Sequence, residues 1–73
     1  MSTRVDIGSR LREERLTQGL TQTQLSERVN IAYSSLSNYE LGYRFPPTEV
    51  LTRLQTLGLD TCYILTGQRP RKD

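Results

Sequence analysis

The sequence has 73 residues, of which 34% are hydrophobic and 25% charged, as expected for one small domain. This length excludes a dinucleotide-binding domain, a TIM barrel and any two-domain enzyme. No apolar run approaches the roughly 20 residues of a membrane helix, and no signal-peptide pattern is present. With no histidine and one cysteine, Cys62, we expect no disulfide, metal, cofactor or catalysis, and a cytoplasmic protein.

The net charge of +2 is concentrated at the C-terminus. Residues 69–73 hold Arg69, Arg71, Lys72 and Asp73, a net of +2, whereas the rest has seven arginines and seven acidic residues. Attraction to nucleic acid must therefore come from local patches or from residues 68–73, which we expect to be a disordered basic tail. The alternative is a solvated C-terminus with no role in binding.

Residues that cap and stop helices predict the first two elements. Asp6 is a good N-cap for a first helix that ends near Gln18, before Gly19. A second helix begins at Thr21, because Thr21 and Gln24 have the spacing of a capping box. Its buried side carries Leu25 and Val29, four residues apart, and Asn30 suits the left-handed position that follows.

Three further helices follow the same signals. The third spans residues 33–41 and stops at Gly42, and the loop 43–47 contains two prolines that cannot lie inside a helix. The fourth spans residues 48–57. A short fifth helix is capped by Asp60 and stopped by Gly67. We therefore expect one domain over residues 1–67, with a helix-turn-helix at about 21–41.

The third helix has two unlike faces at about 100° per residue. Leu36, Tyr39, Glu40 and Ala32 share the inner face, and the outer face holds Ser34, Ser37, Asn38 and Leu41. Small polar side chains allow close approach to a DNA major groove, where Asn can pair with adenine and Ser with several bases. A merely solvated helix with indifferent polar residues fits the pattern equally well.

Glu40 is unusual because it lies on the inner face, where carboxylates are rare unless paired. Arg15 falls on the inner side of the first helix, near Leu11. A buried ion pair between Arg15 and Glu40 would account for both residues. The alternative is two charges exposed at the helix edges.

Several motifs follow one another in a familiar order. They are Ser9-Arg10-Leu11-Arg12, Arg15, Gly19-Leu20-Thr21-Gln22, Gln24-Leu25, Val29, Asn38-Tyr39-Glu40 with Gly42, and Gly58-Leu59-Asp60 through Tyr63-Ile64-Leu65-Thr66-Gly67. The chain resembles the Cro/CI-type helix-turn-helix family of phage repressors, also called the XRE family, over residues 9–67. The resemblance implies an all-α, compact five-helix lambda-repressor-like DNA-binding domain.

The resemblance also implies roles for individual residues. The residues that read bases correspond to Tyr33, Ser34, Ser37 and Asn38, those that bind phosphate to Gln22, Tyr43 and Arg44, and the structural ion pair to Arg15 and Glu40. Two departures stand out. Ala32 replaces the usual Ser or Thr cap of the recognition helix, and Arg44 is the only charge in its loop, which predicts fewer phosphate contacts.

These observations favour a sequence-specific transcription regulator, Cro-like or repressor-like and of phage or prophage origin. We expect it to bind double-stranded DNA at an inverted-repeat operator as a homodimer, with no membrane or small-molecule ligand. Because the chain ends soon after this domain, we expect no self-cleaving dimerisation domain. The dimer interface is predicted among Pro46, Pro47, Leu51, Thr61, Cys62 and Ile64, whose alternative role is core packing.

The alternative function is that of an antitoxin, whose main task is to bind a partner toxin. Such a protein needs an exposed apolar groove or an additional segment, and Leu41, Phe45 and Leu51 are the apolar residues that would supply it. An enzyme is rejected, because no histidine and no carboxylate pair forms a recognisable site.

Overall fold

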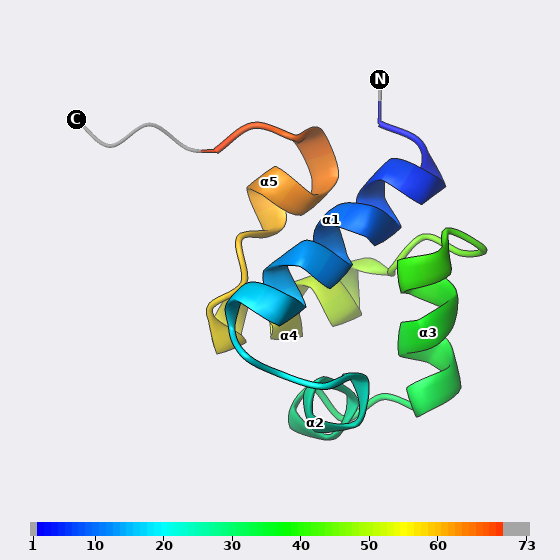
Figure 1. Cartoon of the computed structure of the whole chain (residues 1–73), viewed down its shortest axis with the longest axis vertical. Helices are drawn as coiled ribbons and strands as arrows, with labels where there is room; N and C mark the ends of the chain where they lie inside the picture. The colour runs from blue at the N-terminus through cyan, green and yellow to red at the C-terminus, as the bar shows by residue number, and fades with distance from the viewer. Residues whose placement is uncertain (1, 70–73) are drawn as a thin grey trace.

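A computed structural model describes residues 2–69, which form five helices and no strand. These are α1 (Arg4–Thr17), α2 (Gln22–Arg28), α3 (Tyr33–Leu41), α4 (Thr48–Leu57) and α5 (Thr61–Thr66). In Figure 1, α1 runs through the middle of the molecule, with α3 on one side and α5 on the other. The predicted all-α, five-helix class is confirmed. None of these helices is long and apolar enough to cross a membrane.

Side-chain caps mark the starts of α1, α2 and α5, and one of these caps differs from the prediction. Thr21 Oγ1 accepts from the Gln24 amide at 3.1 Å, so the predicted capping box of α2 is present. For α1, however, the N-cap is Thr3 and not Asp6. Asp6 is the acidic partner of a second capping box, because its carboxylate accepts from the Thr3 amide at 2.9 Å. As a result α1 gains a turn that carries Arg4 and Val5.

The core takes one fully buried side chain from each helix. Leu11, Leu25, Leu36, Leu54 and Ile64 are all inaccessible to solvent. The assignment of Ile64 to a dimer surface is therefore wrong, because α5 turns this residue into the protomer core. Pro46 is also buried, so it offers no surface to a partner either.

Two glycines allow α1 and α3 to pack closely. A Cβ on Gly8 would overlap the carbonyl oxygens of Tyr39 and Glu40. At the end of α3, Gly42 has a φ of +84°, and a Cβ there would lie 2.8 Å from Val5 Cα. Both positions need glycine for lack of space, and Gly42 for its left-handed backbone as well. The orientation of α3 is thus set by direct backbone contact with α1.

Arg69 is ordered against the helices, contrary to the expected disordered tail from Gln68 onward. Its guanidinium lies 3.9 Å from the centre of the Tyr63 ring and pairs with Glu14 at 3.0 Å and Asp60 at 3.1 Å. Glu14 is only 4% exposed, and a buried carboxylate needs a cation. The need of Glu14 for a cation therefore explains why Arg69 packs against the helices. Arg71 and Lys72 lie outside the described residues.

Asp60 makes the stability of α5 dependent on pH. Its carboxylate accepts from the Tyr63 amide at 2.9 Å, and this bond, followed by Arg69, lowers the pKa of Asp60. Because the pKa is lower in the folded protein, the ionised carboxylate stabilises the fold at pH values above the ordinary pKa of aspartate. This stabilisation is lost as the pH falls through the pKa of the folded state.

We therefore predict that the stability advantage of wild type over Asp60→Asn is largest at neutral pH and shrinks below about pH 4. Asn remains a good N-cap, so the variant removes the charge and keeps the cap. Urea unfolding across this pH range measures the difference. A difference that stays constant down to low pH would contradict the prediction.

Candidate nucleic-acid interface

The turn between α2 and α3 is held by hydrogen bonds from several elements. Asn30 adopts a φ of +56°, and the Ile31 amide donates to the Ser26 carbonyl at 2.9 Å. From α4, Arg53 Nη1 donates to the Val29 carbonyl at 3.1 Å and to the Asn30 carbonyl at 3.3 Å. α2 and α3 therefore form a rigid helix-turn-helix, which lies at one end of the molecule (Figure 1).

The outer face of α3 is accessible, as the periodicity predicts. Ser34 is exposed, and Ser37 and Asn38 are partly exposed. Leu36, Tyr39 and Glu40 are buried on the inner face. Ala32 does not join them. It is exposed and acts as the N-cap of α3, with no side-chain hydrogen bond. The outer face thus offers small polar groups, together with the 56% exposed side chain of Leu41, to any surface that α3 meets.

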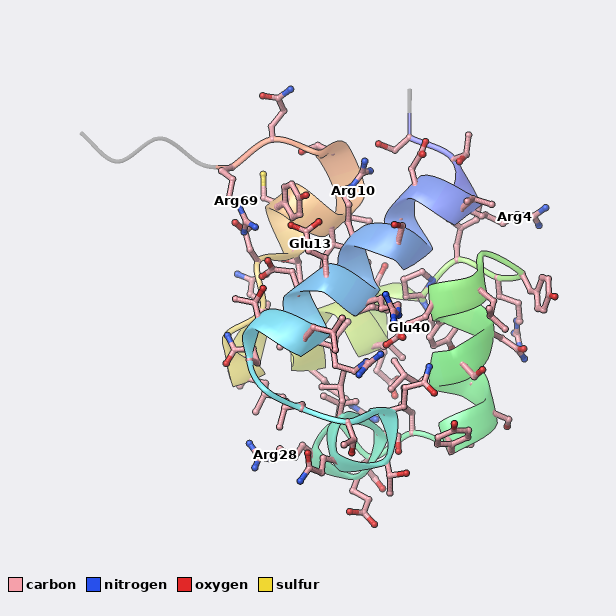
Figure 2. All side chains as sticks on the ribbon, in the orientation of Figure 1. Arg4, Arg10, Glu13, Arg28, Glu40 and Arg69 are labelled. Carbon is pink, nitrogen blue, oxygen red and sulfur yellow. The ribbon has the colours of Figure 1, made fainter. Side chains whose placement is uncertain are left out.

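The ion pair that the helical positions of Arg15 and Glu40 predict is present and buried. Arg15 Nε donates to Glu40 Oε2 at 2.7 Å and Nη2 donates to Oε1 at 3.0 Å, a bidentate pair. The two side chains are 8% and 3% exposed. Arg15 Nη1 also donates to the Leu20 carbonyl at 2.9 Å. Figure 2 shows Glu40 between α1 and α3, so the pair joins these two helices.

Gln22 extends this pair towards the surface, which the sequence analysis did not foresee. Its Nε2 donates to Glu40 Oε1 at 3.1 Å, and its Oε1 accepts from the Tyr33 hydroxyl at 2.8 Å. The side chain predicted to bind phosphate is therefore also a bridge between α2 and α3. Its acceptor and one amide hydrogen are used within the protein, and one amide hydrogen is left for a ligand.

A shallow groove lies where the end of α1 meets the start of α2, beside Tyr33. Its lining includes the exposed Arg12, together with Thr21, Gln22 and Thr23. The groove brings a cation and several polar groups next to the first turn of α3. This position suits a contact with a charged backbone that runs past the outer face of α3.

The loop after α3 is largely exposed. Tyr43 is 66% exposed and Phe45 57% exposed, and Arg44 and Pro47 are also exposed. Further along the chain, Leu51 and Thr61 are partly buried and Cys62 is exposed. These last three and Pro47 are the predicted interface residues that still have accessible surface.

The chain matches a known protein family whose description agrees with the observed fold. Residues 8–69 match the family described as "Helix-turn-helix domain". The chain belongs to this family. The family assignment confirms the resemblance to Cro/CI-type helix-turn-helix proteins that the motifs indicate.

Individual relatives are regulators by name. The chain is 42% identical over 62 residues to the HTH-type transcriptional regulator ImmR of Bacillus subtilis (strain 168), a match that covers 84% of this chain and 49% of ImmR. The chain thus spans about half the length of this curated relative.

Two solved structures share the fold. The restriction-modification controller protein C.AhdI from Aeromonas hydrophila superimposes with a TM-score of 0.76 at 29% identity, over 84% of this chain and 94% of that one. The clp gene regulator ClgR from Corynebacterium glutamicum gives a TM-score of 0.75 at 28% identity, over 85% and 67% of the two chains.

We predict that Arg15→Met or Glu40→Gln alone destabilises the protein by about 3–5 kcal/mol, because each leaves a buried polar partner unpaired. The double variant should lose less than the sum of the two. Thermal and urea unfolding measure these losses. Glu49→Gln is the control, since the pair of Glu49 with Arg53 is exposed and is worth about 0–1 kcal/mol. Losses for Arg15→Met and Glu40→Gln that are additive and no larger than the loss for Glu49→Gln would contradict a structural role for the buried pair.

Proposed function

We propose that this protein is a sequence-specific DNA-binding transcription regulator of the Cro-like or repressor type, from a phage or prophage. The observation that carries the proposal is the outer face of α3, where accessible, small, uncharged polar side chains are presented by a helix held rigidly from behind. The related proteins named as regulators support it. A solvated helix would more commonly carry Glu, Lys or Arg on this face.

In this proposal α3 lies in the major groove and its outer face reads base edges. Asn38 is suited to a bidentate contact with adenine, and Ser34 and Ser37 to single hydrogen bonds with several bases. Tyr33 stands 54% exposed at the start of α3. Its hydroxyl proton is directed to Gln22, so it offers a ring face and an acceptor rather than a donor.

Phosphate contacts would fix the register of α3 on the duplex. Gln22 would use its remaining amide hydrogen, and Tyr43 and Arg44 would act from the loop at the other end of α3. Contacts at both ends of the recognition helix would prevent it from rotating or sliding in the groove. Such a regulator acts by occupying a promoter, needs no catalysis and works where the DNA is, in the cytoplasm.

We predict that Asn38→Ala and Ser34→Ala each reduce discrimination between sites by about 1–3 kcal/mol for every good base contact removed. Binding to unrelated DNA should persist, because it depends on phosphates. The experiment selects duplexes from a random pool with the wild-type chain and then measures the affinity of each variant for selected and unrelated duplexes at one salt concentration.

Thr56→Ala is the matched control for this experiment, because Thr56 is an exposed polar residue on α4, which does not form the helix-turn-helix. It should leave both affinities unchanged. Wild-type selectivity in both α3 variants would refute the assignment of the outer face to base reading.

We also propose a homodimer on an inverted repeat. Three or four reading side chains specify too few bases for a unique site, and two-fold pairing doubles them. The interface would use the exposed surface of Pro47 and Cys62 with the accessible parts of Leu51 and Thr61. This small apolar surface favours a weak dimer in solution that DNA completes by binding both copies.

We predict a complex of two chains on a selected inverted repeat whose half-sites lie about 34 Å apart, and one weakly bound chain on a half-site duplex. Analytical ultracentrifugation of both mixtures measures the stoichiometry. Cys62→Asp should abolish the second binding event and leave half-site binding intact. Tight, specific binding of one chain to the half-site would refute the dimer.

A further inference from the structure

The first turn of α1 lies beside the end of the recognition helix. Gly42, directly after α3, is in contact with Val5. The neighbouring Arg4 places its guanidinium carbon 6.0 Å from the centre of the Phe45 ring. In Figure 2, Arg4 projects outward on the side of the molecule that α3 occupies. The contact therefore brings a cation from α1 to the loop that follows the recognition helix.

Arg4 differs from the other arginines of α1 that face a neighbour. Arg10 donates to the Ile64 carbonyl, and Arg15 is held by Glu40. Arg4 is exposed, and among residues 2–69 no carboxylate pairs with it. Its contact with the Phe45 ring is an aromatic one, which attracts the guanidinium without neutralising its charge.

We propose that Arg4 binds a DNA phosphate at the edge of the groove that α3 enters, and that Phe45 is the positioning residue that holds its guanidinium there. The inference rests on the proposed function. Phosphates line both edges of the major groove, next to the ends of a helix that lies within it. A guanidinium is weakly hydrated and matches two phosphate oxygens at once.

The ring makes the contact more favourable by limiting the conformations that Arg4 would lose on binding. Phe45 is 57% exposed, so its ring is available to the guanidinium while the protein is free. Arg4 also adds a charge at the end of α3 where the loop supplies only Arg44. Together the two arginines would clamp the backbone beyond the last base that α3 reads.

Salt dependence of binding tests the inference directly. Each phosphate contact contributes about 0.9 to the slope of log K against log salt concentration. Arg4→Ala should lower the magnitude of this slope by about 0.9, and it should weaken selected and unrelated duplexes by the same factor. The melting temperature should remain that of wild type, because Arg4 is exposed.

Arg28→Ala is the matched control. Arg28 is also an exposed arginine, at the last position of α2, and Figure 2 shows it on the side of α2 that points away from α3. Its removal changes the net charge equally and should leave the slope unchanged. Equal slopes for the Arg4 and Arg28 variants would mean that the change in slope depends only on net charge, and this result would overturn the inference.

A double-mutant cycle tests the role of Phe45. Phe45→Leu keeps an apolar side chain without the ring, and it should weaken binding in the wild-type background but not in the Arg4→Ala background. Equal effects in both backgrounds would overturn the positioning role. An unchanged slope for Arg4→Ala, in a protein whose wild type binds selected duplexes, overturns the phosphate contact alone. A wild type that binds no duplex overturns the proposed function and the inference with it.

Discussion

The buried pair of Arg15 and Glu40 is the interaction on which the arrangement of the other parts depends. A carboxylate on the inner face of α3 is unfavourable unless a cation meets it, and the cation comes from the last turn of α1. Because the pair is bidentate, it constrains the rotation of α3 about its axis as well as its distance from α1. Gln22 and Tyr33 then carry the same constraint to the protein surface. The network joins three helices through side chains that use most of their hydrogen-bonding capacity, so the orientation of the outer face of α3 is determined within the protein.

A second buried carboxylate solves the same problem in a different way. Glu14 faces the start of α5, where its Oε1 accepts from the Asp60 amide at 2.9 Å, and its other oxygen lies 3.0 Å from Arg69. The cation comes from outside the five helices and rests on the Tyr63 ring. Glu40 thus joins α3, the helix of the proposed DNA surface, to α1. Glu14 joins α5 to α1. Electrostatics and the apolar core both bring the helices together around α1.

Local signals in the sequence predict most of the helix boundaries, because caps and left-handed residues act within a few positions. Thr21, Asp60 and Gly42 have the conformations and bonds that their residue types favour. The prediction of Asp6 as the N-cap of α1 is wrong, because an acidic residue is common both at the N-cap and in the first turn of a helix. Thr3, three residues earlier, completes a capping box with Asp6 and is the N-cap. Burial is harder to predict when an element is short. Ile64 lies on a helix of six residues, which is too short for periodicity to show which of its apolar residues face the core. The buried side of each helix is enough to predict the contact of Arg15 with Glu40, whereas the contacts of Arg69 with Glu14 and of Gln22 with Glu40 have no such signal.

Gly8 illustrates how a residue remote from the outer face of α3 can influence what that face does. It lies on the side of α1 that touches the backbone of Tyr39 and Glu40, and any side chain there would push α3 away from α1. The core would still be apolar and the outer face would keep every polar group, yet the helix would be presented at another angle. Under the proposed function, a genetic screen for altered operator preference should therefore return substitutions near this contact as well as on α3 itself. In such a scaffold, recognition can evolve by tilting an unchanged set of side chains, without replacing any of them.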